Sequence, residues 1–301
     1  IRDREHAFPD FTLAYFPDND FNSHAQGPES AAHTLTQFDD YLGQIFDAYG
    51  GIDQMLGDIA IIITGDHSQS NIVSDPNDAA ILLSEVLQDF SAAELGKGWD
   101  DGTDIILCPN GRVASIYHRN LTQENADQII ANLLQEPRID QVIYSGRHLG
   151  SSDSGYHVVT RDRGKLQFEK ASGQQETLHD LYGTRWAWRG DLGVFGETES
   201  DDNVTIFPEY PNPFERIAGI LESSRSGHIW ATARIGHDFV IPGIDAHAGG
   251  GSHGSLHSLD SSPPMFVAGT TSDIQLPQHP RSIDLVPLSL KILNIDPEKV
   301  E

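Results

Sequence analysis

Short apolar runs and one long helical periodicity alternate over the first 64 residues. Residues 11–16 form an apolar run that predicts a buried strand. A helix is expected from Gly27-Pro28 to Gly50-Gly51, because Leu35, Phe38 and Leu42 recur at helical spacing. Residues 58–64 are apolar on both faces, as in a central parallel strand. The order strand, helix, strand predicts a βαβ unit, in which ligands lie beyond the carboxyl ends of the strands.

The region from about residue 72 to 229 has a different pattern, with short strands and few helices. Residues 104–117 are two apolar runs around Asn110-Gly111, which is a strong hairpin signal. A helix with Ile129, Ile130 and Leu133 on one face follows. Asn212-Pro213 is expected to cap and begin another helix. Further strands are predicted at 141–144, 156–160, 166–168 and 228–232.

The last part of the chain returns to a simple α/β pattern, with a strand at 265–268 and a closing helix at 282–293. The sequence therefore predicts an α/β fold with a mainly parallel central sheet flanked by helices. Residues 1–71 and 230–301 would form this core, and residues 72–229 would form a smaller, β-rich middle section.

The charge of the chain restricts its partners. Its 301 residues include 19 Lys+Arg and 45 Asp+Glu, so the formal net charge is −26. Such a surface repels polyphosphate backbones, which argues against extended nucleic acid as a partner but not against a small anionic substrate bound through cations. The acidity fits simple solubility, or a salt-adapted or secreted protein. The longest apolar runs, such as residues 59–63, are far shorter than the ~20 residues of a membrane span.

Three clusters carry candidate metal chemistry. Asp20 and His24 stand four residues apart, Asp66-His67 follows the apolar run at 58–64, and a glycine-rich loop holds His253. Carboxylate and imidazole groups are common zinc ligands. Each cluster also has a plain structural explanation: a helix start beside a solvated histidine, a capping carboxylate, or an exposed loop. The three together, each at a strand end or in a loop, favour a metal site.

The same clusters, read with their neighbours, resemble a known family. The segments are Pro17-Asp-Asn-Asp-Phe-Asn-Ser-His-Ala-Gln-Gly-Pro28, Thr64-Gly-Asp-His67 and Gly250-Gly-Ser-His-Gly-Ser-Leu-His257. They are similar to the alkaline phosphatase superfamily, and most of all to the type I phosphodiesterase/nucleotide pyrophosphatase family. The strand at 264–269 and the helix at 282–293 agree with this resemblance. It implies an alkaline-phosphatase-like fold.

The resemblance also implies a site with two divalent metals, usually zinc, with manganese or iron as substitutes. Asp20, His24 and His253 would hold one metal, and Asp66 with His67 would help to hold the other. Two cations ~3.5–4 Å apart clamp the attacking and leaving oxygens of an in-line phosphoryl transfer. His247 and His257 flank His253 and would lie in a second shell or face the substrate, or would be solvated loop residues.

The chain departs from the family in one respect. Members carry an Asp ligand and a Ser or Thr nucleophile on an earlier strand, and only 19 residues precede Asp20 here. Thr12 lies in the predicted strand at 11–16 and does not match that nucleophile. The sequence thus predicts the C-terminal part of such an enzyme, and the nucleophile segment is expected to be cleaved, left out or lost.

The expected function is metal-dependent hydrolysis of a small phosphate ester, a phosphodiester or nucleotide pyrophosphate rather than a simple monoester. Two alternatives remain open. One is a non-catalytic metal-binding remnant or fragment, and the other is a phosphomonoesterase or phosphomutase of the same superfamily. The family resemblance favours a secreted or periplasmic location.

Overall fold

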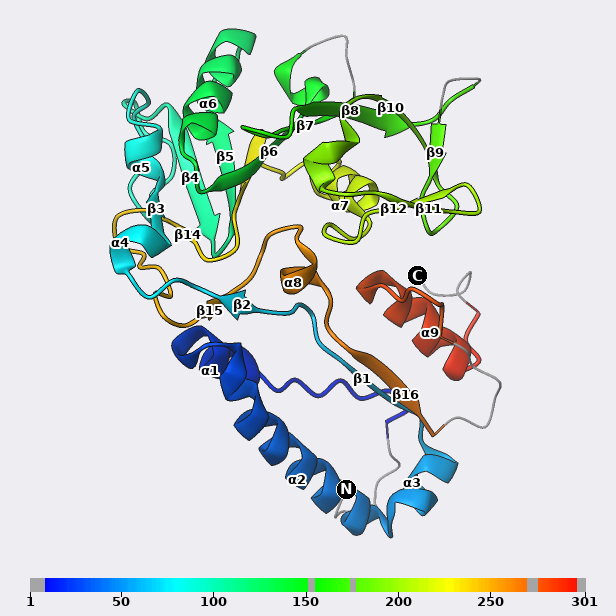
Figure 1. The fold of residues 1–301 in the computed structure, drawn as a ribbon. Helices are drawn as coiled ribbons and strands as arrows, with labels where there is room; N and C mark the ends of the chain where they lie inside the picture. Colours follow the sequence, from blue (N-terminus) through cyan, green and yellow to red (C-terminus); the bar gives the residue numbers. More distant parts are fainter. Residues whose placement is uncertain (1–8, 151–154, 174–176, 270–275, 297–301) are drawn as a thin grey trace. The chain divides into compact units, whose positions relative to one another are not determined.

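The computed structural model describes residues 9–150, 155–173, 177–269 and 276–296 (Figure 1). The chain divides into two compact units. Unit 1 comprises residues 1–23, 29–68 and 262–301, and unit 2 comprises residues 24–28 and 69–261. The sequence placed residues 230–261 with the predicted core, but pairing of the strand at 229–233 with its neighbours draws this segment into unit 2.

In its described residues, unit 1 consists of helices and one pair of strands, which Figure 1 shows side by side. Its elements are the 3-10 turn η1 (Pro28–Ser30), α2 (Ala31–Tyr49), α3 (Ile52–Asp58), β1 (Ile61–Thr64), β16 (Met265–Ala268), the 3-10 turn η4 (Ser282–Asp284) and α9 (Leu285–Ile292). Helix α2 confirms the long helix predicted from periodicity. It ends where Gly50 adopts a left-handed conformation with φ 115°, as a C-terminal glycine commonly does. The predicted closing helix is also present as η4 and α9.

Two strand predictions for unit 1 are wrong. Residues 11–16 form no strand, and Phe11 and Leu13 are 59% and 82% exposed. The expected central parallel strand is shorter, beginning at Ile61, and pairs antiparallel with β16 in the register Ile61↔Ala268. The predicted βαβ unit therefore does not form among the described residues. An apolar run shows that a segment can be buried, but a strand also needs a neighbouring edge to pair with.

Unit 2 is built on a ten-stranded sheet with the order β11-β12-β9-β10-β8-β7-β6-β13-β5-β4. The strands are β4 (Ile105–Asn110), β5 (Val113–His118), β6 (Ile139–Ser145), β7 (Tyr156–Val159), β8 (Lys165–Lys170), β9 (Thr177–His179), β10 (Arg185–Gly190), β11 (Glu199–Asp201), β12 (Val204–Ile206) and β13 (Ile229–Ala233). Neighbours pair antiparallel except β12 with β9. The prediction of a mainly parallel sheet is thus not borne out, and the fold is a mixed α/β fold.

Short connections explain the antiparallel pairing. The Asn110-Gly111 turn joins β4 to β5 directly, and two strands joined by so short a turn can only run antiparallel. Gly111 has φ 59°, which this turn requires. The predicted hairpin is confirmed, as are the predicted strands of the middle section.

The remaining elements of unit 2 are short, apart from two helices. They are β2 (Ser70–Asn71), α4 (Pro76–Ala79), β3 (Ala80–Leu82), α5 (Leu83–Val86), α6 (Gln123–Gln135), η2 (Gly146–Leu149), η3 (Leu192–Phe195), α7 (Pro213–Leu221), β14 (Asp238–Val240), β15 (Gly251–Ser252) and α8 (Ser258–Ser261). Helix α1 (Asp18–Gln26) is continuous across the boundary between the units. Helix α7 begins at Pro213 as predicted, but the Asn212 side chain makes no capping bond to the backbone and instead donates to Glu215.

Two apolar clusters form the core of unit 2. One packs the inner face of α6, including Ile129 and Leu133, against β5, β6 and β13. The other is rich in aromatic rings and gathers around Phe214 of α7. Together they bury both predicted helices of the middle section against the sheet, so this sheet is a rigid base for the loops attached to it.

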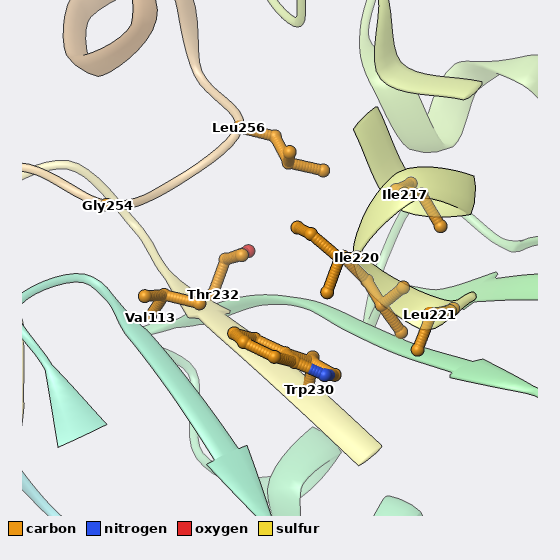
Figure 2. Close-up of a pocket in the computed structure, with 9 residues that line it drawn as sticks. Val113, Ile217, Ile220, Leu221, Trp230, Thr232, Gly254 and Leu256 are labelled. Atoms are coloured by element: carbon orange, nitrogen blue, oxygen red, sulfur yellow. The ribbon is translucent and has the colours of Figure 1, made fainter. Parts of the chain in front are cut away.

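A small cavity of about 30 Å³ lies between α7, β13 and the loop after His253 (Figure 2). Its lining is apolar except for Thr232, which is 2% exposed and whose Oγ1 has no hydrogen-bond partner. A water molecule there would have few polar partners, so the hydroxyl stays unpaired. We expect Thr232→Val to raise the free energy of unfolding by about 1 kcal/mol, because the unpaired group is removed at nearly constant volume.

Thermal and urea denaturation would measure this effect. Thr160→Val is the matched control, since Thr160 is also buried but its Oγ1 accepts from Arg163 N–H at 2.9 Å and donates to Gly164 O at 3.1 Å. The free energy of unfolding of this control variant should fall by about 1 kcal/mol. Equal destabilisation by both variants would contradict the view that the Thr232 hydroxyl is unsatisfied.

One buried histidine, His118, and one partly buried histidine, His228, are expected to make unit 2 sensitive to acid. His118 Nδ1 accepts from Asn120 N–H at 3.1 Å, and His228 Nδ1 accepts from His118 N–H at 3.0 Å. Burial lowers the pKa of both side chains below 6.5, and for His228 the neighbouring His148 lowers it further. Asp104 opposes the shift in the pKa of His118 without reversing it.

We expect stability to fall as the pH drops below about 6.5, because the unfolded chain then binds protons that the folded chain does not. His228→Asn keeps an acceptor in place of Nδ1 but does not titrate. This variant should therefore lose less stability between about pH 7 and pH 5 than the parent protein. Urea denaturation at several pH values measures how the free energy of unfolding depends on pH. The same dependence in the variant and the parent protein would exclude His228 as a source of the acid sensitivity.

Candidate metal centre

Helix α1 carries the first two candidate ligands. It starts just after Pro17, and its first turn is acidic, which suits the positive end of the helix dipole. Asp20 and His24 are four residues apart and therefore share a face of this one helix. One carboxylate oxygen and one ring nitrogen of the pair lie within 4.8 Å of each other. Both side chains are partly exposed, which leaves them accessible to an ion.

The ring of His24 is oriented by the backbone of β15. Its Nδ1 lies 2.9 Å from Gly251 O, and because a carbonyl only accepts, Nδ1 carries the proton. Nε2 is then the nitrogen with a lone pair in the neutral ring. Metal-binding histidines characteristically donate their other ring N–H in this way. Gly250 permits this approach, since a Cβ there would collide with His24 O.

His253 follows β15 and lies beside His24 in unit 2. The two ring centroids are 5.2 Å apart, and one ligand nitrogen of each ring lies within 4.8 Å of the other. Strand β15 pairs antiparallel with β2, and Arg112 N–H donates to His253 O at 2.8 Å. The glycine-rich loop predicted from sequence is therefore tied to the rest of unit 2 just before the histidine and at the histidine itself.

In unit 1, the residues after β1 gather near Asp20. His67 Nδ1 donates to Ser68 O at 3.2 Å, so Nε2 of the neutral ring again has the lone pair. This Nε2 lies 3.7 Å from Asp20 Oδ1 and 3.7 Å from Asp66 Oδ1. The Asp66 side chain is 74% exposed. The structure thus places His67 beside the Asp20 carboxylate, and Asp66 beside His67.

His247 is held beside His24 by a buried carboxylate. Its Nδ1 donates to Asp238 Oδ2 at 2.8 Å, and its ring stacks on His24 with centroids 4.2 Å apart. Asp238 is 1% exposed; burial raises its pKa, but hydrogen bonds from His247 outweigh this and hold the pKa below its usual value. Asp238 was not identified from the sequence, because no local motif links it to His247. A second-shell role for His247 remains a prediction.

His257 has a local structural contact. Its Nδ1 accepts from Leu259 N–H at 3.1 Å, at the start of α8, and its ring lies 5.4 Å from the ring of Tyr210. Neither contact involves the candidate ligands Asp20, His24 and His253. The second-shell role predicted for His257 remains a prediction.

The donor set is one that zinc accepts. A carboxylate and two imidazoles are available at Asp20, His24 and His253, and both His24 and His67 direct their Nδ1 protons to backbone carbonyls. Nitrogen donors with a carboxylate are typical of zinc sites, and also suit other divalent transition metals. The residues present therefore fit a divalent metal.

Comparisons with known proteins agree with the motif positions. The family model described as type I phosphodiesterase / nucleotide pyrophosphatase matches residues 2–256, a stretch that includes Asp20, Asp66 and His253. A search of curated proteins found no match. Among the described residues, none of the helices is long and apolar enough to cross a membrane.

Proposed function

The chain belongs to the type I phosphodiesterase/nucleotide pyrophosphatase family, a family of hydrolases, and from this premise we propose that it hydrolyses phosphate esters with the help of bound divalent metals. The substrate we propose is a phosphodiester or a nucleotide pyrophosphate. The observation that carries the proposal is the cluster on α1, where Asp20 and His24 offer ligand atoms within 4.8 Å of each other.

We assign the ligands as the motif positions suggest. Asp20, His24 and His253 would hold one metal, and Asp66 with His67 would contribute to a second. Two features support this assignment. His24 and His67 both use Nδ1 as a donor to a carbonyl, and Asp20 contacts His67 within unit 1 at 3.7 Å.

When bound, two divalent metals would polarise the phosphoryl group and stabilise charge on the attacking and leaving oxygens. The chain's own residues would then act by binding and orienting. Asp20 and Asp66 supply negative charge that partly balances the cations, and the carbonyls of Gly251 and Ser68 fix the rings of His24 and His67. Bound cations would also make the site attractive to an anionic substrate in a chain with a net charge of −26.

A non-catalytic metal-binding protein is the second candidate. The ligand atoms at Asp20 and His24 are sufficient for it, because metal binding by itself requires no nucleophile. Metal binding without turnover would be its signature, so the two candidates differ in a single measurable property.

Turnover of chromogenic esters tests the proposal. We expect bis(p-nitrophenyl) phosphate to be hydrolysed faster than p-nitrophenyl phosphate, and a chelator to abolish both activities until zinc is restored. The assay is run on the 301-residue chain and, where the intact mass of the natural protein exceeds 33.0 kDa, on the natural protein as well. Zinc binding without turnover in either form would select the non-catalytic candidate. Turnover that resists chelation would refute the role of the metals.

A further inference from the structure

Arg112 is an arginine with no exposed surface, next to the hairpin turn Asn110-Gly111. Burying a guanidinium is costly unless its donors are satisfied, so a wholly buried arginine indicates a specific role. Its hydrogen bonds converge on two backbone segments and one carboxylate. They run from Nη1 to Ser70 Oγ at 2.5 Å, Ser252 O at 2.9 Å and Asp260 Oδ1 at 2.5 Å, and from Nη2 to Ser70 O at 2.8 Å and Asn71 O at 3.1 Å.

Arg112 also binds the backbone of the segment that carries His253 and orients His24. Its backbone N–H donates to His253 O at 2.8 Å, and its guanidinium holds the carbonyl of the preceding residue, Ser252. The residue before that, Gly251, provides the carbonyl that orients His24. Arg112 therefore fixes the three-residue segment 251–253, which carries one ligand and orients another.

Asp260 binds the chain on the C-terminal side of His253. Its side chain is fully buried; Oδ1 pairs with Arg112, and Oδ2 accepts from Ser255 N–H at 3.1 Å and Ser255 Oγ at 2.6 Å. Within the ion pair, Arg112 thus binds Ser252, the residue before His253, and Asp260 binds Ser255, two residues after it. A segment held on both sides has little freedom to move the histidine between them.

Gly111 gives an independent indication of the same contact. A Cβ at this position would lie 2.6 Å from His253 O and 2.7 Å from Ser252 Oγ. The hairpin turn therefore presses against the backbone of His253 so closely that only glycine fits. Turn geometry alone requires a positive φ here, but it does not require this close approach to another segment.

We propose that Arg112 is a positioning residue of the candidate metal centre: through the backbone of residues 251–253 it sets the placement of His253 and the ring orientation of His24. This inference rests on the proposed function, since it assigns a role toward a metal bound there. Outer partners of metal ligands typically change affinity by about 10–100-fold, and we expect an effect of that size.

Zinc affinity of the purified chain, measured by isothermal titration calorimetry, tests the first part. Arg112→Met removes the fork of donors, and we expect it to weaken zinc binding by about 10–100-fold. Arg112→Lys keeps the charge with fewer directed donors, so its zinc affinity should lie between those of the parent chain and Arg112→Met. Arg138→Met is the matched control, because Arg138 also pairs with a carboxylate, Glu136, and with carbonyls of residues 77, 78 and 80. The control should lose stability but keep its zinc affinity.

A pair of glycine variants tests the contact without altering charge. Gly111→Ala and Gly183→Ala both place a side chain at positive φ, 59° and 78°, but only Gly111 has atoms close to the added Cβ. We expect weaker zinc binding in Gly111→Ala and unchanged binding in Gly183→Ala. This pair also decides the matter if Arg112→Met does not fold.

The outcomes separate this inference from the function it rests on. If the parent chain binds zinc and the folded Arg112 and Gly111 variants bind it equally well, the positioning role is refuted while the metal centre stands. If the parent chain binds no zinc, the proposed function fails and the inference falls with it. Loss of affinity in Arg138→Met and Gly183→Ala as well would show a general effect of instability, and would also refute the specific role.

Discussion

His253→Ala should weaken zinc binding by more than about 100-fold, a larger effect than the 10–100-fold expected for an outer partner. The side chain would supply one of the three ligands assigned to this metal, and its ring lies 5.2 Å from that of His24 within unit 2. Asp20→Asn should have a comparable effect, because it removes the negative charge from a centre that binds a divalent cation. Calorimetry gives the affinity, and elemental analysis of the purified protein gives the number of metals bound.

A histidine outside the cluster provides the control for this experiment. His179 lies on β9, and its replacement by alanine removes an imidazole without touching the candidate ligands. We expect His179→Ala to bind zinc as the parent chain does. Unchanged metal content in His253→Ala, with the fold intact by circular dichroism, would show that the assigned cluster is not the site.

Phe214→Ala should lower the free energy of unfolding by about 3–5 kcal/mol, the largest effect on stability that we expect from a single substitution. Phe214 of α7 has no exposed surface, and its ring is the centre of the aromatic cluster in unit 2. Four rings have their centroids within 6 Å of it: Phe168 at 4.3 Å, Phe207 at 5.5 Å, Trp186 at 5.6 Å and Phe195 at 5.7 Å. Truncation leaves a void that these rings cannot fill without losing their own contacts.

Urea denaturation followed by tryptophan fluorescence measures this loss, since Trp186 packs against Phe214 and reports on the same cluster. Ile220→Ala is the control on the same helix, because Ile220 is 37% exposed. Ile220→Ala should lower the free energy of unfolding by about 1 kcal/mol or less. Similar losses in both variants would mean that the aromatic cluster does not dominate the stability of unit 2.

Local sequence signals predicted local structure well. The Asn110-Gly111 hairpin, helix α2 with its glycine end and helix α6 were all expected, because each depends on residues close together in the chain. Capping and turn signals act over a few residues, so their physical cause is contained in the sequence window that shows them.

Strand pairing was not predictable in the same way. The run at 11–16 is apolar enough for a strand, yet it forms none, and β1 pairs with β16 from about 200 residues away in the opposite direction from that expected. The direction of pairing depends on which distant edge is available. Periodicity within a segment does not contain that information.

The same distinction between local and distant residues applies to the candidate site. By itself the sequence determined the helix spacing that puts Asp20 and His24 on one face, and the motif positions that identify the family, because both depend on residues near each other in the chain. Only the tertiary structure brought His253 beside His24 and placed a buried Arg112 behind it. Those contacts join segments more than 100 residues apart. They depend on packing and ion pairing in an interior that several segments form together, so no single segment contains the information that determines them.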